Sequence, residues 1–585
     1  MYKLLDTINN PADIKKLSQE ELVTLSSEIR SALFNRLTKK GGHFGSNFGT
    51  VEMEIAMHYV FDSPQDKIVY DVSHQAYTHK ILTGRKNSFT NEDEFKKITG
   101  YTNPKESPHD FFEVGHTSTS ISLASGLAKA RDLKKEKSNI IAVIGDGSLS
   151  GGEALEGLNV VGSELKTNFI LVINDNDLFI AEPHGAVSKN LKELRKTKGK
   201  SEQNIFKCFG FDYIYEENGN DVKKLISLFS KVKDIDHPIA LHICTKKGSG
   251  YEIAEADGEG WHWCEPFDIK TGKPTYDGEY PESYFDIIHT YVMERAKKDK
   301  DFLFITPSYP GAALLSSEDR KELAEKYLDV GIAEEHAVAM ASGAAKGGSN
   351  VMVLTDVSFI QRTYDQISQD LSLNSNPATI LLEYTFVGCE ERTHLSIFMQ
   401  SVFPNIPNLV VLAPTCKKEL IAMLDWSMSQ KDYPVVIFTP RGDVSYREVS
   451  LDFSQKKYSI ELKGSQVAIF AVGGMFEKAI ELAGKIKQKF NIEPSLINPR
   501  FISEIDSQTL NEIMNNHKII ITLEDAIRYG GFGEKIAEYY GTNSDIKVKT
   551  YGFDKVFYEE YDEQELFEKN NMTIPQILKD LEQLL

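Results

Sequence analysis

Two short polar motifs in the first part of the chain combine residue types that bind phosphate and a hard cation. Gly-Asp-Gly at 145–147 follows an apolar run, and Asn-Asp-Asn-Asp at 174–177 ends the next one. In an open parallel sheet, ligands collect where strands end and helices begin. Glycines there let backbone N–H groups approach a phosphate, and a helix N-terminus favours negative charge. Oxygens of Asp146 and Asn176 can therefore complete an octahedral Mg²⁺ site together with phosphate oxygens.

The two motifs carry the prediction only in combination. A Gly-Asp-Gly triplet alone fits an ordinary tight turn between a strand and a helix. The triplet followed by Asn-Asp-Asn at this distance is the thiamine diphosphate motif, in which Asp146 and Asn176 supply metal ligands. The backbone carbonyl of Leu178 is a candidate third ligand. The sequence thus predicts thiamine diphosphate and Mg²⁺ as cofactors.

A glutamate in the middle of the chain supplies the complementary chemistry. Thiamine diphosphate loses its C2 proton to its own 4′-amino group, and a buried carboxyl bonded to the pyrimidine ring favours the reactive tautomer. Glu334 is the candidate, because an apolar Gly-Ile-Ala segment leads it into an Ala- and Gly-rich helix. Taken alone, this pattern also fits the acidic first turn of an ordinary helix. The preceding diphosphate motifs favour the catalytic interpretation.

Short β-branched runs alternate with helical patterns along the chain, which predicts three consecutive α/β domains. The expected strands are 139–145, 168–175, 351–355, 379–383, 409–414, 435–440, 467–474 and 519–525. A helical pattern at 154–161 joins the first two strands into a βαβ unit. Polar stretches at 266–282 and 441–459 separate the domains. We expect the basic stretch 190–200 to be a solvated, mobile loop.

Composition excludes several classes of protein. The 585 residues carry a net charge of −20, which opposes general binding to nucleic acid or to anionic membranes. Five scattered cysteines without a Cys-x-x-Cys pair favour a reducing compartment and no disulfide framework. The N-terminal residues lack the apolar core of a signal peptide, and no apolar run approaches the ~18 residues that span a bilayer. We therefore expect a cytoplasmic protein without a membrane segment.

At these motifs the chain resembles the 1-deoxy-D-xylulose-5-phosphate synthase family of transketolase-like thiamine diphosphate enzymes. The likeness runs nearly the whole length and adds further segments to those already named: 41–52, 71–85, 115–122, 246–263, 329–338, 358–366, 392–394 and 439–442. The resemblance implies two thiamine-diphosphate-binding folds and a transketolase C-terminal-like domain. Their expected bounds are 1–275 for the diphosphate and Mg²⁺ domain, 283–445 for the pyrimidine domain and 460–585 for the C-terminal domain.

The resemblance also implies a role for each matching position. The diphosphate and thiazolium would be lined by His74, Gly115, His116, Thr117, Gly147, Ser148 and Asn176. Ile180 would hold the cofactor in its bent shape, Tyr251 would lie near it, and Phe359 would stack on the pyrimidine. Hydrogen-bond donors and proton shuttles around the substrates would be His43, His262 and His394. Arg362 and Arg441 would bind substrate carboxylate or phosphate.

Three positions depart from the family pattern near the expected acceptor site. Asp356 stands where the family has a tyrosine, Glu383 or Tyr384 where it has an arginine, and Glu390 where it has an aspartate. In the family, that tyrosine and arginine help to hold the acceptor's phosphate. A glutamate in place of an arginine exchanges attraction for repulsion toward a dianion. The segment after Asn190 is also shorter than is usual in the family.

The implied reaction is decarboxylation of pyruvate and transfer of the two-carbon unit to glyceraldehyde 3-phosphate, giving 1-deoxy-D-xylulose 5-phosphate for isoprenoid and thiamine biosynthesis. One alternative is a carboligase or transketolase-type enzyme that uses another aldehyde or ketose, because the acceptor-site residues differ. Another is a catalytically silent, cofactor-binding relative, and a third is a decarboxylase of a dehydrogenase complex. The resemblance implies a homodimer.

Overall fold

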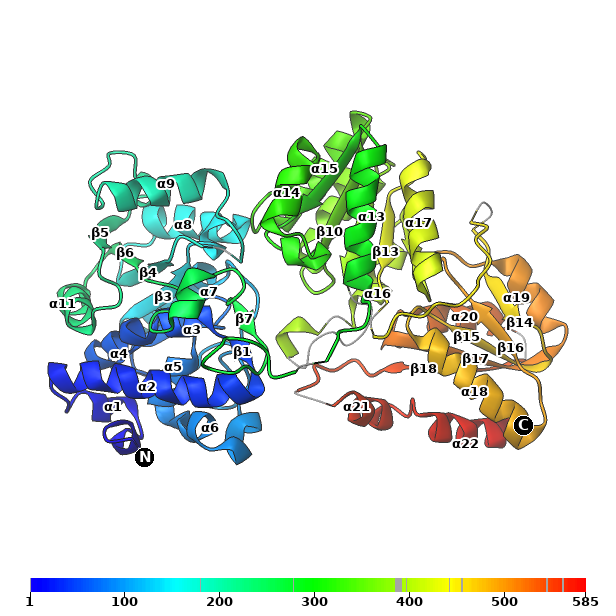
Figure 1. Ribbon diagram of the computed structural model, residues 1–585, viewed down its shortest axis with the longest axis horizontal. Coiled ribbons are helices and arrows are strands. Elements are labelled where there is room, and N and C mark those ends of the chain that lie inside the picture. The colour runs from blue at the N-terminus through cyan, green and yellow to red at the C-terminus, as the bar shows by residue number, and fades with distance from the viewer. Residues whose placement is uncertain are drawn as a thin grey trace. The chain divides into compact units, whose positions relative to one another are not determined.

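The structure is a computed structural model that describes residues 2–178, 180–276, 278–383, 392–395, 397–440, 442–453, 456–542, 545–559 and 562–585. The chain divides into two compact units (Figure 1). The first comprises Met1–Glu279 and Gly331–Ala333, and the second comprises Tyr280–Val330 and Glu334–Leu585. No helix among the described residues is long and apolar enough to cross a bilayer.

The first unit is built on a parallel sheet of order β2-β3-β4-β6-β5. Its strands are β2 (Lys67–Tyr70), β3 (Ile140–Gly145), β4 (Phe169–Asp175), β5 (Asp212–Glu216) and β6 (Pro238–Cys244). Side chains alternate between the faces of a strand. Accordingly Ile141 and Val143 of β3 join one buried cluster, while Ala142 and Ile144 join another. This sheet is buried on both sides, as its β-branched runs predict.

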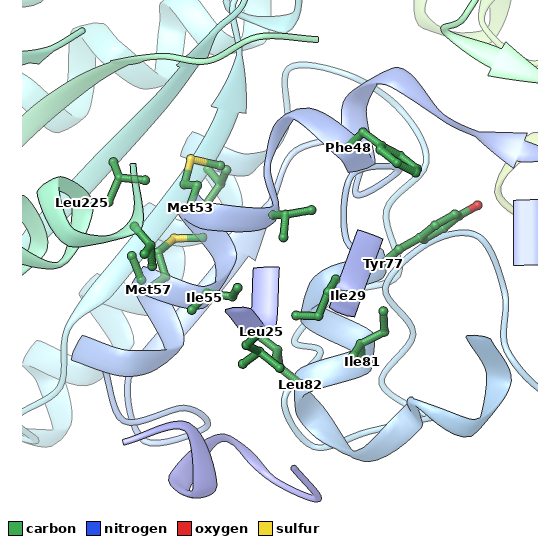
Figure 2. Packing of buried hydrophobic residues seen from close by; sticks show 14 of the residues in the cluster. Leu25, Ile29, Phe48, Met53, Ile55, Met57, Tyr77, Ile81, Leu82 and Leu225 are labelled. Carbon is green, nitrogen blue, oxygen red and sulfur yellow. The ribbon is translucent and has the colours of Figure 1, made fainter. Parts of the chain in front are cut away.

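Helices cover both faces of this sheet. They are α1 (Pro11–Ile14), α2 (Gln19–Lys40), α3 (Gly45–Gly49), α4 (Val51–Val60), α5 (Tyr77–Lys80), α6 (Asn87–Thr90), α7 (Ser120–Lys134), α8 (Gly152–Glu164), α9 (Gly185–Lys196), α10 (Ile205–Cys208), α11 (Val222–Val232) and α12 (Glu252–Ala256). Figure 2 shows how Leu25 and Ile29 of α2, Met53 and Met57 of α4 and Leu225 of α11 pack on one face. Helices α7 and α8 pack on the other. A short antiparallel pair, β1 (Gly42–His43) and β7 (Trp263–Cys264), completes the unit.

The expected loop at 190–200 is wrong over most of its length. Helix α9 extends from Gly185 to Lys196, and only the residues after it form a turn. The basic residues hid an apolar stripe, because Leu191 and Leu194 are buried one helical turn apart. Those two side chains fix α9 on the same core as α8.

The second unit contains two sheets. The first, of order β12-β13-β11-β10-β8-β9, is parallel throughout and consists of β8 (Phe302–Thr306), β9 (Tyr327–Asp329), β10 (Asn350–Asp356), β11 (Thr379–Glu383), β12 (Val410–Leu412) and β13 (Val435–Phe438). The accompanying helices are α13 (Tyr284–Lys298), α14 (Ser317–Leu323), α15 (Glu334–Lys346), α16 (Met399–Val402) and α17 (Lys417–Ser429).

The last sheet has the order β14-β16-β15-β17-β18, with β14 as an antiparallel edge strand. It consists of β14 (Ser459–Leu462), β15 (Gln466–Ala471), β16 (Ser495–Asn498), β17 (His517–Ile527) and β18 (Lys547–Phe553), with helices α18 (Met475–Phe490), α19 (Ser507–Met514), α20 (Phe532–Tyr540), α21 (Glu563–Lys569) and α22 (Ile574–Leu584). All eight expected strands are present within a few residues of their predicted bounds, which confirms three consecutive α/β folds.

Candidate active site

The two polar motifs of the first unit lie side by side at the carboxyl edge of its sheet. Strands β3 and β4 are parallel neighbours with Gly145 opposite Asn174. Asp146 directly follows the end of β3, and Asn176 directly follows the end of β4. The backbone N–H of Asp146 donates to the carbonyl of Asn174 at 3.2 Å. The structure therefore brings the two predicted metal ligands to the same edge.

The surroundings of these two side chains fit a divalent cation. Asp146 is buried, and burial, followed by the neighbouring Asp175 carboxylate, raises its pKa well above the usual range. Asn176 Oδ1 is buried and has no hydrogen-bond partner within the described part of the chain. A Cβ added to Gly145 would meet no atom within 4 Å, which leaves room beside the turn. A carboxyl group and an unpartnered amide oxygen at one sheet edge are the oxygen donors that Mg²⁺ prefers.

A buried aspartate ties the segment 115–119 to the turn that follows β3. Asp71 accepts the backbone N–H groups of Ser118 at 2.8 Å and Ser120 at 2.9 Å. The hydroxyl of Ser118 in turn donates to the carbonyl of Ser148 at 2.7 Å. These bonds hold the start of α7 close to Ser148. The predicted diphosphate residues of this segment, which directly precede Ser118, are Gly115, His116 and Thr117.

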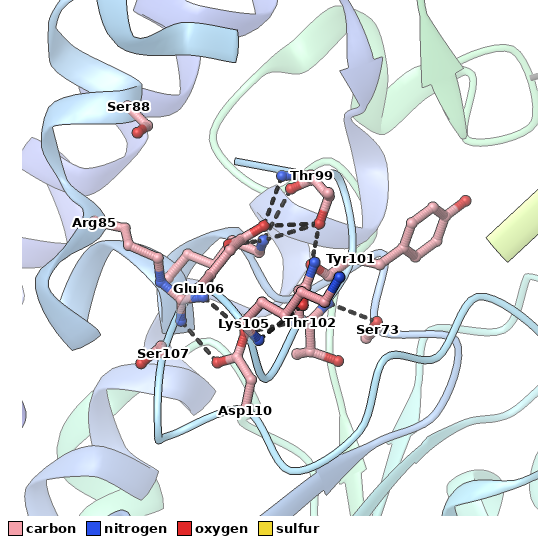
Figure 3. Close-up of polar contacts among 12 residues, drawn as sticks. Ser73, Arg85, Ser88, Thr99, Tyr101, Thr102, Lys105, Glu106, Ser107 and Asp110 are labelled. Atoms are coloured by element: carbon pink, nitrogen blue, oxygen red, sulfur yellow. Dashed lines mark hydrogen bonds and ion pairs between the residues drawn. The ribbon is translucent and has the colours of Figure 1, made fainter. Parts of the chain in front are cut away.

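An ion-pair network fixes the chain that leads into this segment (Figure 3). Arg85 donates to both oxygens of Asp110, at 2.7 and 2.8 Å, and to Glu106 at 3.1 Å. Ser73 accepts the backbone N–H of Thr102 at 3.0 Å, which links the network to the residue next to His74. Buried polar contacts of this kind give the segment one defined course.

Three predicted histidines gather in the first unit. The ring centroids of His43 and His74 lie 5.1 Å apart, those of His43 and His262 5.7 Å, and those of His74 and His262 5.5 Å. The pairing of β1 with β7 brings His43 beside His262, because His43 lies opposite Trp263. Burial, followed by the neighbouring cationic groups, lowers the pKa of His43 and His262 well below the usual range. The lowered pKa favours the neutral imidazole in both residues, and a neutral imidazole has one N–H that can donate a hydrogen bond.

Lys247 is a further candidate site residue, which the sequence interpretation missed. Its side chain is 5 % exposed, and burial lowers its pKa to about 8, against the attraction of Asp146 and two further carboxylates. It also interacts electrostatically with His43 and His262. A buried cation at this place suits the charge of a diphosphate. The signal was present, since Lys247 lies three residues after the end of β6, in the Lys-Lys-Gly-Ser-Gly-Tyr motif.

Tyr251 and Ile180 are two other residues of the first unit that are predicted to contact the cofactor. The ring of Tyr251 packs edge-on against Phe34 and Trp261, and its hydroxyl donates to the carbonyl of Ile269 at 3.0 Å. Ile180 is half-buried just beyond the turn that contains Asn176. Their roles toward the cofactor stay predictions.

In the second unit, Glu334 begins α15 and is 5 % exposed. Burial raises its pKa to about 7, and the nearby Arg362 opposes part of that rise. Arg362 Nη1 lies 3.8 Å from Glu334 Oε2, an oxygen that has no hydrogen-bond partner among the residues described. A carboxyl in this state exchanges a proton near neutral pH. Phe359 meets His394 edge to face, with centroids 5.6 Å apart.

The two described departures from the family pattern face each other across neighbouring strands. Asp356 at the end of β10 pairs in register with Glu383 at the end of β11. Asp356 accepts from the backbone and hydroxyl of Ser358 at 2.6 and 2.5 Å, whereas neither oxygen of Glu383 has a partner in the described ranges. Burial, followed by Asp356, raises the pKa of Glu383 well above its usual range. A neutral Glu383 repels a phosphate less than the sequence suggested. Tyr384, Glu390 and Arg441 lie outside the described residues.

Comparisons with known proteins agree with these motifs. A family model described as 1-deoxy-D-xylulose-5-phosphate synthase matches residues 5–204 and 195–245. The models for the transketolase pyrimidine binding domain and the transketolase C-terminal domain match 283–446 and 456–577.

Two curated relatives cover nearly the whole chain. The 1-deoxy-D-xylulose-5-phosphate synthase of Caldanaerobacter subterraneus subsp. tengcongensis is 37 % identical over 97 % of this chain and 96 % of its own length. The synthase of Clostridium acetobutylicum is 35 % identical over 94 % of both chains.

Proposed function

Because the chain belongs to the 1-deoxy-D-xylulose-5-phosphate synthase family, we propose that it decarboxylates pyruvate and transfers the two-carbon unit to glyceraldehyde 3-phosphate, forming 1-deoxy-D-xylulose 5-phosphate. The chain is a transketolase-class transferase that uses thiamine diphosphate and a divalent cation such as Mg²⁺. One observation supports this function above all: nearly full-length relatives at 35–37 % identity carry that name. The buried, unpartnered amide oxygen of Asn176 beside Asp146 adds structural support.

We assign the charged end of the cofactor to the first unit. Asp146, Asn176 and the carbonyl of Leu178 would hold the cation. The diphosphate would be bound by His74, the loop 115–117, Gly147 and Ser148, with Lys247 as an added cation. Backbone N–H groups of the 147–152 turn and the beginning of α8 suit the diphosphate charge. Ile180 and Tyr251 would contact the thiazolium side.

We assign the pyrimidine end to the second unit. When bound, the cofactor supplies a thiazolium electron sink for decarboxylation and carbon–carbon bond formation. Glu334 would hold and share a proton with the pyrimidine nitrogen, a task that its raised pKa suits. Phe359 would stack on that ring.

The remaining predicted residues would act on the substrates. Neutral His43 and His262 would donate hydrogen bonds to substrate oxygens and move protons, with His394 in a similar role. Arg362 and Arg441 would bind the carboxylate or phosphate of a substrate. Asp356, Glu383 and Glu390 would lie near the acceptor.

The family relationship does not favour the alternative of another aldehyde or ketose acceptor. The experiment that decides is product analysis with ¹³C-labelled pyruvate, Mg²⁺ and thiamine diphosphate, offered glyceraldehyde 3-phosphate beside neutral aldehydes. We expect labelled 1-deoxy-D-xylulose 5-phosphate and CO₂. Product from a neutral aldehyde alone would contradict the proposal.

We further propose that the chain works as a homodimer in the cytoplasm. The dimer follows from the family resemblance, and the location from the scattered cysteines without a disulfide pattern. Light scattering coupled to size-exclusion chromatography checks the first point: a mass of one chain would contradict it.

A further inference from the structure

Helix α9 contacts the turn that carries Asn176 and Leu178 through one side chain, that of Arg195. Arg195, one residue before the end of α9, places Nη1 2.5 Å from both carboxylate oxygens of Asp175. Its Nη2 donates to Asp177. The guanidinium is mostly buried and the Asp175 side chain is fully buried, so solvent screens this contact little.

The Asp175 carboxylate also accepts a hydrogen bond from a second side chain. His242 on β6 donates from Nε2 at 2.6 Å, and the hydroxyl of Tyr213 on β5 meets the other ring nitrogen at 2.8 Å. The carboxylate is therefore bound from two sides, by Arg195 and by His242.

The same carboxylate shapes the turn. The backbone N–H of Asp177 donates to Asp175 Oδ1 at 3.1 Å, which closes an Asx-type turn around Asn176. Asp177 adopts the left-handed conformation, with φ of 60°, which non-glycine residues rarely adopt without local support. Within this turn, the Asn176 oxygen is buried and unpartnered while its neighbours on both sides bind Arg195. One side of the turn is thus anchored and the other offers a ligand.

We propose that Arg195 is a positioning residue for the magnesium site: through Asp175 and Asp177 it fixes the turn that presents Asn176 and Leu178 to the cation. The inference rests on the proposed function, because it presumes that Mg²⁺ and thiamine diphosphate bind at this edge. Arginine suits the task better than lysine, since its planar fork reaches two carboxylates at once. Helix α9 thereby becomes part of the cofactor site.

The test compares Arg195→Met and Arg195→Lys with a matched control, Lys196→Met. Lys196 is the next residue of α9 and is exposed. Cofactor-free proteins are titrated with Mg²⁺ at saturating thiamine diphosphate, and heat of binding is measured. Loss of an outer-shell partner typically weakens metal affinity by about 10–100-fold, and we expect this range for Arg195→Met. Arg195→Lys should recover part of the affinity, and Lys196→Met should match the wild type.

Two additional measurements separate positioning from a merely structural role. At saturating Mg²⁺ and cofactor, kcat of Arg195→Met should return close to the wild-type value, since the residue does not touch the reacting atoms. His242→Gln, which loosens Asp175 from its other side, should also raise the Mg²⁺ requirement.

Three results would overturn the inference. The first is an unchanged Mg²⁺ titration in Arg195→Met. The second is a loss of kcat that saturating Mg²⁺ does not restore. The third is an equal loss of Mg²⁺ affinity in Arg195→Met and Arg195→Lys. If the wild type itself binds no thiamine diphosphate, the proposed function fails first, and this outcome is seen in the wild-type titration alone.

Discussion

Two buried carboxylates of the first unit, Asp71 and Asp175, contrast with two of the second unit, Glu334 and Glu383. In the first unit, Asp71 and Asp175 accept several hydrogen bonds each and hold neighbouring chain segments in place. In the second unit, Glu334 and Glu383 are buried with oxygens that have no partner in the described structure, and the pKa of each is raised. A cation and a diphosphate need ligands fixed by satisfied contacts. An acid that shares a proton needs a carboxyl that solvent and partners do not hold in the ionised form.

We expect the largest effect from Asp146→Ala, which should abolish cofactor binding in the first unit. The substitution removes a proposed metal ligand, so binding of thiamine diphosphate in the presence of Mg²⁺ should fall below detection in calorimetry. Asp93→Ala changes an exposed carboxylate of the same unit and should bind normally. Retained binding in Asp146→Ala would remove this residue from the metal site.

Glu334→Gln should separate binding from catalysis. The amide keeps the size of the side chain but cannot give or take the proton, so turnover of pyruvate should fall by about 10²–10⁴-fold, the range for a lost acid–base group. Cofactor affinity should change little. Glu335→Gln, at the next position of α15, is the matched control and should stay active. Equal turnover in Glu334→Gln and wild type would disprove the assigned role.

Lys247→Met should weaken cofactor binding without abolishing it. A hydrogen bond to a charged group contributes about 1.5–3 kcal/mol, which corresponds to about 10–150-fold in affinity. The neighbouring Lys246 is exposed and pairs with Glu255, so Lys246→Met serves as the control. Calorimetry with thiamine diphosphate measures both. Equal losses in the two variants would show that Lys247 acts only through general charge.

Glu383→Gln should give the smallest effect, and one that depends on pH. A carboxyl whose pKa is raised by folding stabilises the protein below its unfolded pKa, and this stabilisation is lost as pH rises through the folded pKa. The glutamine amide does not ionise, so the variant does not lose this stability as pH rises. The thermal midpoint of Glu383→Gln should therefore exceed that of the wild type at pH 8, with the difference vanishing near pH 4. The opposite trend would mean that Glu383 is ionised and paired.

Much of this account was predictable from the sequence, because its signals are local. Apolar β-branched runs set the strands, and motifs at the strand ends placed Asp146 and Asn176 at one sheet edge. Helix α9 and Arg195 were not predictable, since charged residues obscured the two leucines that anchor the helix. The surroundings of Glu383 were also hidden: a sequence shows a carboxylate, whereas only tertiary packing shows that it is buried opposite Asp356.

The most direct test of the central claim is calorimetric titration of the wild-type protein with thiamine diphosphate, with Mg²⁺ and again with excess chelator. The account predicts saturable binding of one cofactor per chain that requires the cation. No uptake in the presence of Mg²⁺, or equal uptake in the chelator, would contradict it.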